Sequence, residues 1–243
     1  MRDLGFLPNS GIIFLDNCIF STSLRNKFSK QELNEDREQF KNLQKTFSVK
    51  DNWLVIPEII EEFEKGNNYL YRLNEEIDGR TLFKNLTKNK FSKNKAKKLM
   101  KKIRVCNERK GYIDERRYFL NDFLMEDFRD ATGNLTEEKY QRMKELIRKI
   151  KPMFLKNNNR RKFSDLNTDC KLIATALVYA ETNNLPSKDA NIYLFSYDNP
   201  LLETFVDATK KLDLNLENTF VINKTHSVIP SWKYRTNRDL QYS

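Results

Sequence analysis

Short apolar runs alternate along the chain with longer amphipathic segments. Four of these runs are rich in β-branched and aromatic residues, and they cover residues 12–15, 53–56, 191–196 and 219–222. Runs of this length that are apolar at nearly every position are typical of strands buried on both faces, as in parallel sheets. The pattern therefore predicts four strands, two near each end of the chain.

Helical spacing and helix-start signals separate these runs. Ser29 and Glu32 form a capping box, and apolar residues then recur with helical periodicity as far as Phe47. Pro57 stands where a helix begins, and this helix is expected to end at Lys65, before a glycine. Residues 67–163 are predicted to be helical throughout, with amphipathic helices at 119–128 and 135–150 and a polar connection at 156–162. Two further helices are predicted, from 172 to about 184 and over 201–206.

Strands that alternate with helices predict an α/β fold in three layers, with a central parallel sheet flanked by helices. The strands lie only toward the ends, so the helical middle is interpreted as a large insertion. We divide the chain into a first half of the core (1–66), a basic α-helical insertion (67–163), a second half of the core (164–223) and a basic C-terminal tail (224–243).

The charge is concentrated in this middle segment. The 243 residues carry a formal net charge of +10, and residues 80–117 alone hold 15 basic and 3 acidic side chains. Phe83, Phe91 and Tyr112 are interleaved with the basic residues, which favours contact with a phosphate backbone. The candidate substrate-binding residues here are Lys93, Lys95, Lys97, Lys98, Lys101, Lys102 and Arg104.

Several other classes of protein are disfavoured. Three cysteines without metal-ligand spacing indicate a reducing compartment, and no apolar segment indicates a membrane span, so we expect a cytoplasmic protein. No glycine-rich phosphate loop is present, and the one histidine, His226, lies near the C-terminus, which disfavours an acyl-transfer triad.

Carboxylates follow the predicted strands. Asp16 and Asp198 come directly after two of them, and ligand sites of α/β sheets lie beyond the carboxyl ends of strands. The helix after the second strand carries Glu61 and Glu62, and Asp169 lies in the first turn of a later helix. Clustered carboxylates repel one another unless a cation lies between them, so this pattern predicts a site for Mg²⁺ or Mn²⁺.

Four stretches together resemble the PIN-domain nuclease family. Residues 12–16 are similar to its first strand with an Asp, and residues 55–63 to its second strand and Glu-bearing helix. Residues 169–177 match its Asp followed by an Ile-Ala-x-Ala helix, which is the most specific of the four motifs. Residues 193–198 are similar to its strand that ends in Ser/Thr-x-Asp.

This resemblance implies a metal-dependent phosphodiesterase, usually acting on RNA. Asp16, Glu62, Asp169 and Asp198 would be the catalytic residues and would hold one or two Mg²⁺ or Mn²⁺ ions. The ions would orient a water for attack on phosphorus and stabilise the leaving 3′ oxygen, and the products would carry a 5′ phosphate. Glu61 is the alternative to Glu62, and Asn17 and Ser196 are further candidate substrate contacts.

Two positions depart from the family pattern. Cys18 stands where the family often has Asn, and Pro200 stands where it often has a further acid. The alternatives to a nuclease are a non-catalytic nucleic-acid-binding module of the same fold, and a ribonuclease toxin held by a protein antitoxin. The choice between RNA and DNA stays open.

Overall fold

The computed structural model describes residues 7–21, 30–65, 92–98, 116–125, 129–157, 167–181, 191–212, 214 and 217–234. Side chains at 21, 30–37 and 39 are outside this description. No helix of the described residues is long and apolar enough to cross a membrane.

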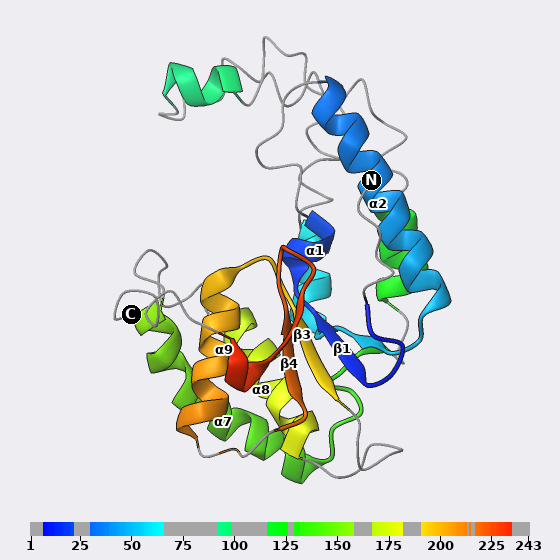
Figure 1. Ribbon diagram of the computed structural model, residues 1–243. Helices are drawn as coiled ribbons and strands as arrows, with labels where there is room; N and C mark the ends of the chain where they lie inside the picture. Colours follow the sequence, from blue (N-terminus) through cyan, green and yellow to red (C-terminus); the bar gives the residue numbers. More distant parts are fainter. Residues whose placement is uncertain are drawn as a thin grey trace.

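A five-stranded sheet forms the centre of the molecule, in the order β2-β1-β3-β4-β5 (Figure 1). Its strands are β1 (Ile12–Leu15), β2 (Trp53–Leu54), β3 (Ile192–Phe195), β4 (Thr219–Ile222) and β5 (Val228–Pro230). The first four are mutually parallel, and β5 runs antiparallel to β4. The four predicted strands are confirmed, although β2 is shorter than the apolar run that predicted it.

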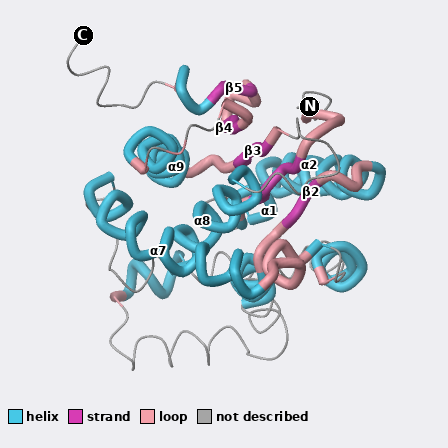
Figure 2. Tube along the Cα trace, turned by 90° about the horizontal axis from the view of Figure 1, so that it is seen from below, coloured by secondary structure: helices cyan, strands magenta, loops and turns pink. Residues whose placement is uncertain are grey.

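Helices flank the sheet on both sides, as expected for strands that are apolar along their whole length. On one side lie α7 (Glu137–Asn157), α8 (Asn167–Glu181) and α9 (Asn199–Lys211), and α2 (Lys30–Val49) lies on the other (Figure 2). The short helix α1 (Asn17–Ser21) follows β1 directly, and a helix over 57–65 follows β2. All four residues of β3 are buried, consistent with a central strand covered on both faces.

The helical middle of the chain contributes to this core. The helix α7 packs against α8 and α9, and its buried residues Met143, Leu146, Ile150 and Phe154 belong to the same hydrophobic cluster as the strands. Residues 137–157 of the predicted insertion therefore pack into the hydrophobic core. Of residues 67–115, the structure describes 92–98, which include a helix at 93–98.

Residues 129–131 extend the edge of the sheet, so the prediction of continuous helix over 67–163 is wrong here. The Val55 N–H donates to the Arg129 carbonyl at 3.0 Å, and the Ala131 N–H donates to the Val55 carbonyl at 2.8 Å. The Arg129 guanidinium lies 4.1 Å from the centroid of the Trp53 ring and donates to the Asp51 carbonyl. These contacts hold the segment beside β2.

Part of the predicted C-terminal tail forms regular structure. Residues 228–230 form β5, and η4 (Ser231–Lys233) follows it as a single 3₁₀ turn. The Thr219 and Ser231 hydroxyls lie 2.6 Å apart and are buried, and Trp232 packs on Phe220. The structured core therefore extends beyond residue 223.

A buried arginine joins η1 (Leu120–Leu124) and the residues before it to the core. Arg116 is 1% exposed, and its guanidinium donates to the Phe20 carbonyl at 2.8 Å. The same group lies 4.5 Å from the Phe63 ring centroid and 5.2 Å from that of Phe40. The contacts of the guanidinium with the two aromatic rings and the carbonyl compensate part of the free-energy cost of burying its charge.

We predict that Arg116→Ala lowers the free energy of unfolding by about 2–4 kcal/mol, because it removes a buried hydrogen bond and contacts with two rings. The neighbouring Arg117 is exposed, so Arg117→Ala is the matched control and should change stability by less than about 0.5 kcal/mol. Urea denaturation followed by circular dichroism measures both values. Equal effects of the two variants would show that residues 116–124 are not part of the core.

Candidate functional site

The carboxyl ends of the parallel strands meet at one edge of the sheet, and the candidate residues lie there. Asp16 follows β1, and the segment from Ser196 to Asp198 follows β3. The register pairs Leu15 with Phe195, so the next residues, Asp16 and Ser196, emerge side by side. This edge, where ligand sites of open α/β sheets form, is called the rim below.

Asp16 is the central carboxylate of the rim. It is 6% exposed, its backbone N–H donates to the Phe195 carbonyl at 3.1 Å, and the Ser196 hydroxyl donates to Asp16 Oδ2 at 2.7 Å. Burial raises the pKa of Asp16, and the nearby carboxylates of Asp198 and Glu62 raise it further. Hydrogen bonds from Cys18 and Ser196 oppose this rise, so they stabilise the charged form.

Asp198 is held beside Asp16 through the same hydroxyl. The Asp198 backbone N–H donates to Ser196 Oγ at 2.9 Å, so one serine contacts both segments. Asp198 stands at the N-cap of α9, but its side chain makes no capping hydrogen bond. The Asp198 carboxylate therefore does not cap α9, which is the usual structural role of an Asp at this position.

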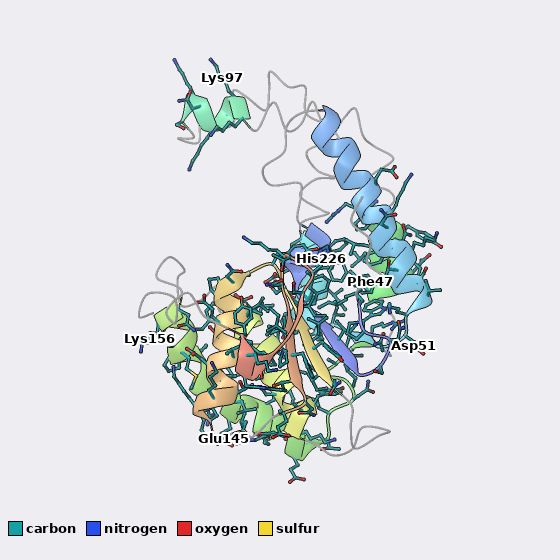
Figure 3. All side chains as sticks on the ribbon, viewed as in Figure 1. Phe47, Asp51, Lys97, Glu145, Lys156 and His226 are labelled. Atoms are coloured by element: carbon teal, nitrogen blue, oxygen red, sulfur yellow. The ribbon has the colours of Figure 1, made fainter. Side chains whose placement is uncertain are left out.

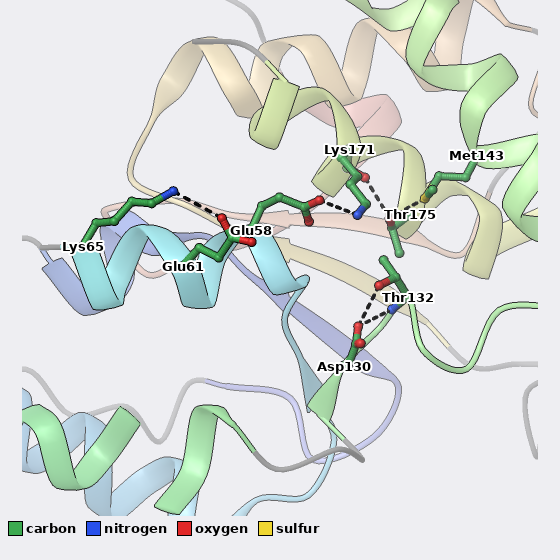
Figure 4. Close-up of polar contacts among 8 residues, drawn as sticks. All are labelled: Glu58, Glu61, Lys65, Asp130, Thr132, Met143, Lys171 and Thr175. Atoms are coloured by element: carbon green, nitrogen blue, oxygen red, sulfur yellow. Dashed lines mark hydrogen bonds and ion pairs between the residues drawn. The ribbon is translucent and has the colours of Figure 1, made fainter. Parts of the chain in front are cut away.

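The structure distinguishes Glu62 from Glu61. Glu62 Oε2 accepts a hydrogen bond from Asn17 Nδ2 at 3.1 Å, which places this carboxylate at the start of α1 and near Asp16. Glu61 forms an exposed ion pair with Lys65 at 3.2 Å (Figure 4). Both side chains are exposed, but Glu62 is hydrogen-bonded to the residue after Asp16 and so belongs to the rim, whereas Glu61 pairs within its own helix.

Asp169 is placed less directly. It is 8% exposed in the first turn of α8, and it acts with burial to raise the pKa of Cys170 to about 12. Two residues on, Lys171 Nζ lies 2.5 Å from Glu58 Oε1 and joins α8 to the helix over 57–65 (Figure 4). The start of α8 is thus near the Glu62 helix, but Asp169 is not among the groups that shift the pKa of Asp16.

Cys18 is a site residue whose role was not predicted from the sequence. Its Sγ accepts the Tyr197 N–H at 3.0 Å and lies 3.3 Å from Ser196 Oγ. Burial and the Asp16 carboxylate raise the pKa of this thiol well above its usual value, so it stays protonated. The signal that could have found it is its position, two residues after Asp16, where a hydrogen-bonding side chain reaches the end of β3.

The chemistry of these donors suits a hard divalent cation, because the buried Asp16 carboxylate lies near the half-buried Asp198 and the exposed Glu62 carboxylates. Among the described residues, no three His, Cys, Asp or Glu side chains converge closely enough to hold a metal ion. The carboxylates are therefore neighbours, held by Ser196 and Asn17, rather than a closed ligand set.

The candidate phosphate-binding residues lie on a separate helix. Lys93, Lys95, Lys97 and Lys98 are exposed on the helix over 93–98, whereas Ala96 is buried. Figure 3 shows Lys97 beyond the same end of the sheet as His226. Lys101, Lys102 and Arg104 lie outside the described residues.

Comparison with known protein families, characterised proteins and solved structures finds no match to the chain.

We predict that Asp16→Asn stabilises the metal-free protein. The amide can still accept the Ser196 O–H, but it removes a buried charge that faces two other carboxylates. In EDTA near pH 7.5, Tm should rise by about 2–4 °C, or about 1 kcal/mol for a chain of this size.

The sign of the pH dependence follows from the raised pKa of Asp16. The folded wild-type protein gains stability as this group takes up a proton, so the advantage of Asp16→Asn should shrink from about pH 7.5 to about pH 5. Thermal unfolding at both pH values measures it, with Glu61→Gln as the exposed control. A Tm for Asp16→Asn at or below that of the wild type at pH 7.5 would contradict the electrostatic account of the site.

Proposed function

We propose that the protein is a divalent-metal-dependent nuclease that hydrolyses phosphodiester bonds, with RNA as the favoured substrate. The observation that carries the proposal is the buried Asp16 carboxylate beside Asp198 and Glu62 at the carboxyl ends of the strands. A buried Asp16 carboxylate that is repelled by two neighbouring carboxylates costs stability, and a bound cation offsets this cost. The resemblance to PIN-domain nucleases supports the same assignment.

Asp16, Glu62 and Asp198 would hold Mg²⁺ or Mn²⁺, and Asp169 would join them from the start of α8. A metal ion bound there supplies charge stabilisation at phosphorus and lowers the pKa of a coordinated water. Ser196 orients the Asp16 carboxylate, and Asn17 orients Glu62. These hydrogen bonds hold the carboxylates ready, so less rearrangement is needed when substrate binds.

The reaction is a hydrolysis. The oxygen of water forms a bond to phosphorus, the bond from phosphorus to the 3′ oxygen breaks, and that oxygen takes up a proton. The products are a 5′ phosphate and a 3′ hydroxyl. The exposed lysines of the helix over 93–98 would bind phosphates of the substrate away from the anionic rim.

A second candidate function is binding of nucleic acid without cleavage. The observation that favours it is that no metal-ligand set converges among the described residues. In this case the basic segment would do the binding, and the rim carboxylates would have no chemical role. Loss of a rim carboxylate should abolish cleavage if the protein is a nuclease, and should change only its stability if the protein is a binding module.

The matched pair Glu62→Gln and Glu61→Gln separates them. With Mn²⁺ and single-stranded RNA, we predict that Glu62→Gln and Asp16→Asn reduce the cleavage rate by about 100-fold or more, because each removes a carboxylate from the ion. Glu61→Gln should cleave at close to the wild-type rate, since its partner is the exposed Lys65. Gel analysis of labelled RNA and DNA, with metal and with EDTA, measures these rates.

Wild-type protein that binds RNA but cleaves neither RNA nor DNA would overturn the nuclease proposal in favour of the binding module. Equal cleavage by the Glu61 and Glu62 variants would overturn the assignment of the rim as the catalytic site.

A further inference from the structure

The turn between β4 and β5 extends the rim beyond the carboxylates. Because β4 is parallel to β3, residues 223–227 leave the sheet at the same edge as Ser196 and Asp198. Figure 3 shows His226 at this end of the sheet. The rim therefore has a carboxylate part, made by Asp16, Glu62 and Asp198, and a second part on the β4 side.

Two rings form the second part. Tyr197 and His226 are stacked with centroids 6.0 Å apart and an interplanar angle of 28°, and Tyr197 Oη lies 3.1 Å from His226 Nε2. Both rings pack edge-on against Phe195, which is fully buried at the end of β3. Both are themselves only half-buried. Phe195 thus holds the two rings in place, and part of their surface stays exposed at the rim.

The backbone of this turn is held in an uncommon conformation. His226 has φ of +61°, and it is the one described non-glycine residue in the left-handed region. Its N–H donates to the Asn223 carbonyl at 2.9 Å, and the Asn223 side chain accepts from Thr225. This backbone conformation is energetically unfavourable, and it brings the imidazole against Tyr197. Strained backbone of this kind is common at functional sites.

Charge divides the two parts of the rim. The carboxylates repel a phosphodiester backbone unless a cation is bound. The ring pair carries no carboxylate, and the exposed Lys224 on the same turn attracts phosphate. Aromatic faces bind nucleobases of any sequence by stacking. Tyr197 lies between Ser196 and Asp198 in the chain, so a base stacked on these rings would lie at the same strand end as the carboxylates.

We propose that Tyr197 and His226 form a stacking platform for the nucleobase next to the scissile phosphate. The proposal rests on the nuclease function and specifies its substrate class: a base can reach this platform only when it is free of a duplex, so the substrate is single-stranded nucleic acid.

The test compares two ligands on two variants. Binding is measured by fluorescence anisotropy to a short single-stranded RNA and to the same backbone without bases, in an Asp16→Asn background so that no cleavage occurs. The variant His226→Asn removes the ring and suits the left-handed backbone, because Asn adopts it readily. Trp232→Ala is the matched control, since this exposed aromatic packs on Phe220 at the opposite end of β4 from His226.

The measured quantity is the ratio of the two affinities, because a purely structural role for His226 would weaken both ligands equally. We expect His226→Asn to reduce the preference for base-bearing RNA by roughly tenfold and Trp232→Ala to leave it unchanged. An unchanged ratio in His226→Asn, or no binding of either RNA, would overturn the platform. Because no cleavage is involved, a failed nuclease assay with an intact preference would reject the nuclease and keep the platform.

Discussion

The hydrogen bond from the Ser196 hydroxyl to the Asp16 carboxylate, 2.7 Å long, is the contact on which the candidate site depends. It exists because β1 and β3 are adjacent and in register, so that the residues after Leu15 and Phe195 meet. The same hydroxyl accepts the Asp198 N–H and lies near the Cys18 thiol. One serine thereby fixes a buried carboxylate, the turn after β3 and the start of α1.

Much of this arrangement could be predicted from the sequence. The apolar runs give the strands, and the rule that parallel strands end at a common edge brings Asp16 and Asp198 together. The choice between Glu61 and Glu62 could not be made this way, because adjacent residues on a helix differ by only about 100° in direction. The choice depends on Asn17, which reaches Glu62 from a different element.

Other features depend on contacts that no local pattern carries. The helix α7 has the amphipathic spacing of any surface helix, and only its packing on α8 and α9 shows that it belongs to the core. Residues 129–131 join the sheet edge through Arg129 and Val55, which are far apart in the sequence. β5 is a three-residue edge strand whose first residue is exposed, so its hydrophobic signal is weak.

The central claim is that the rim carboxylates, which repel one another, bind a divalent cation. Measuring the binding of Mn²⁺ tests this claim most directly. Isothermal titration calorimetry should show at least about one Mn²⁺ bound per wild-type chain at millimolar concentration. Asp16→Asn and Glu62→Gln should lose this binding, whereas Glu61→Gln should keep it. Equal Mn²⁺ binding by the wild type and all three variants, or none by the wild type, would contradict the claim.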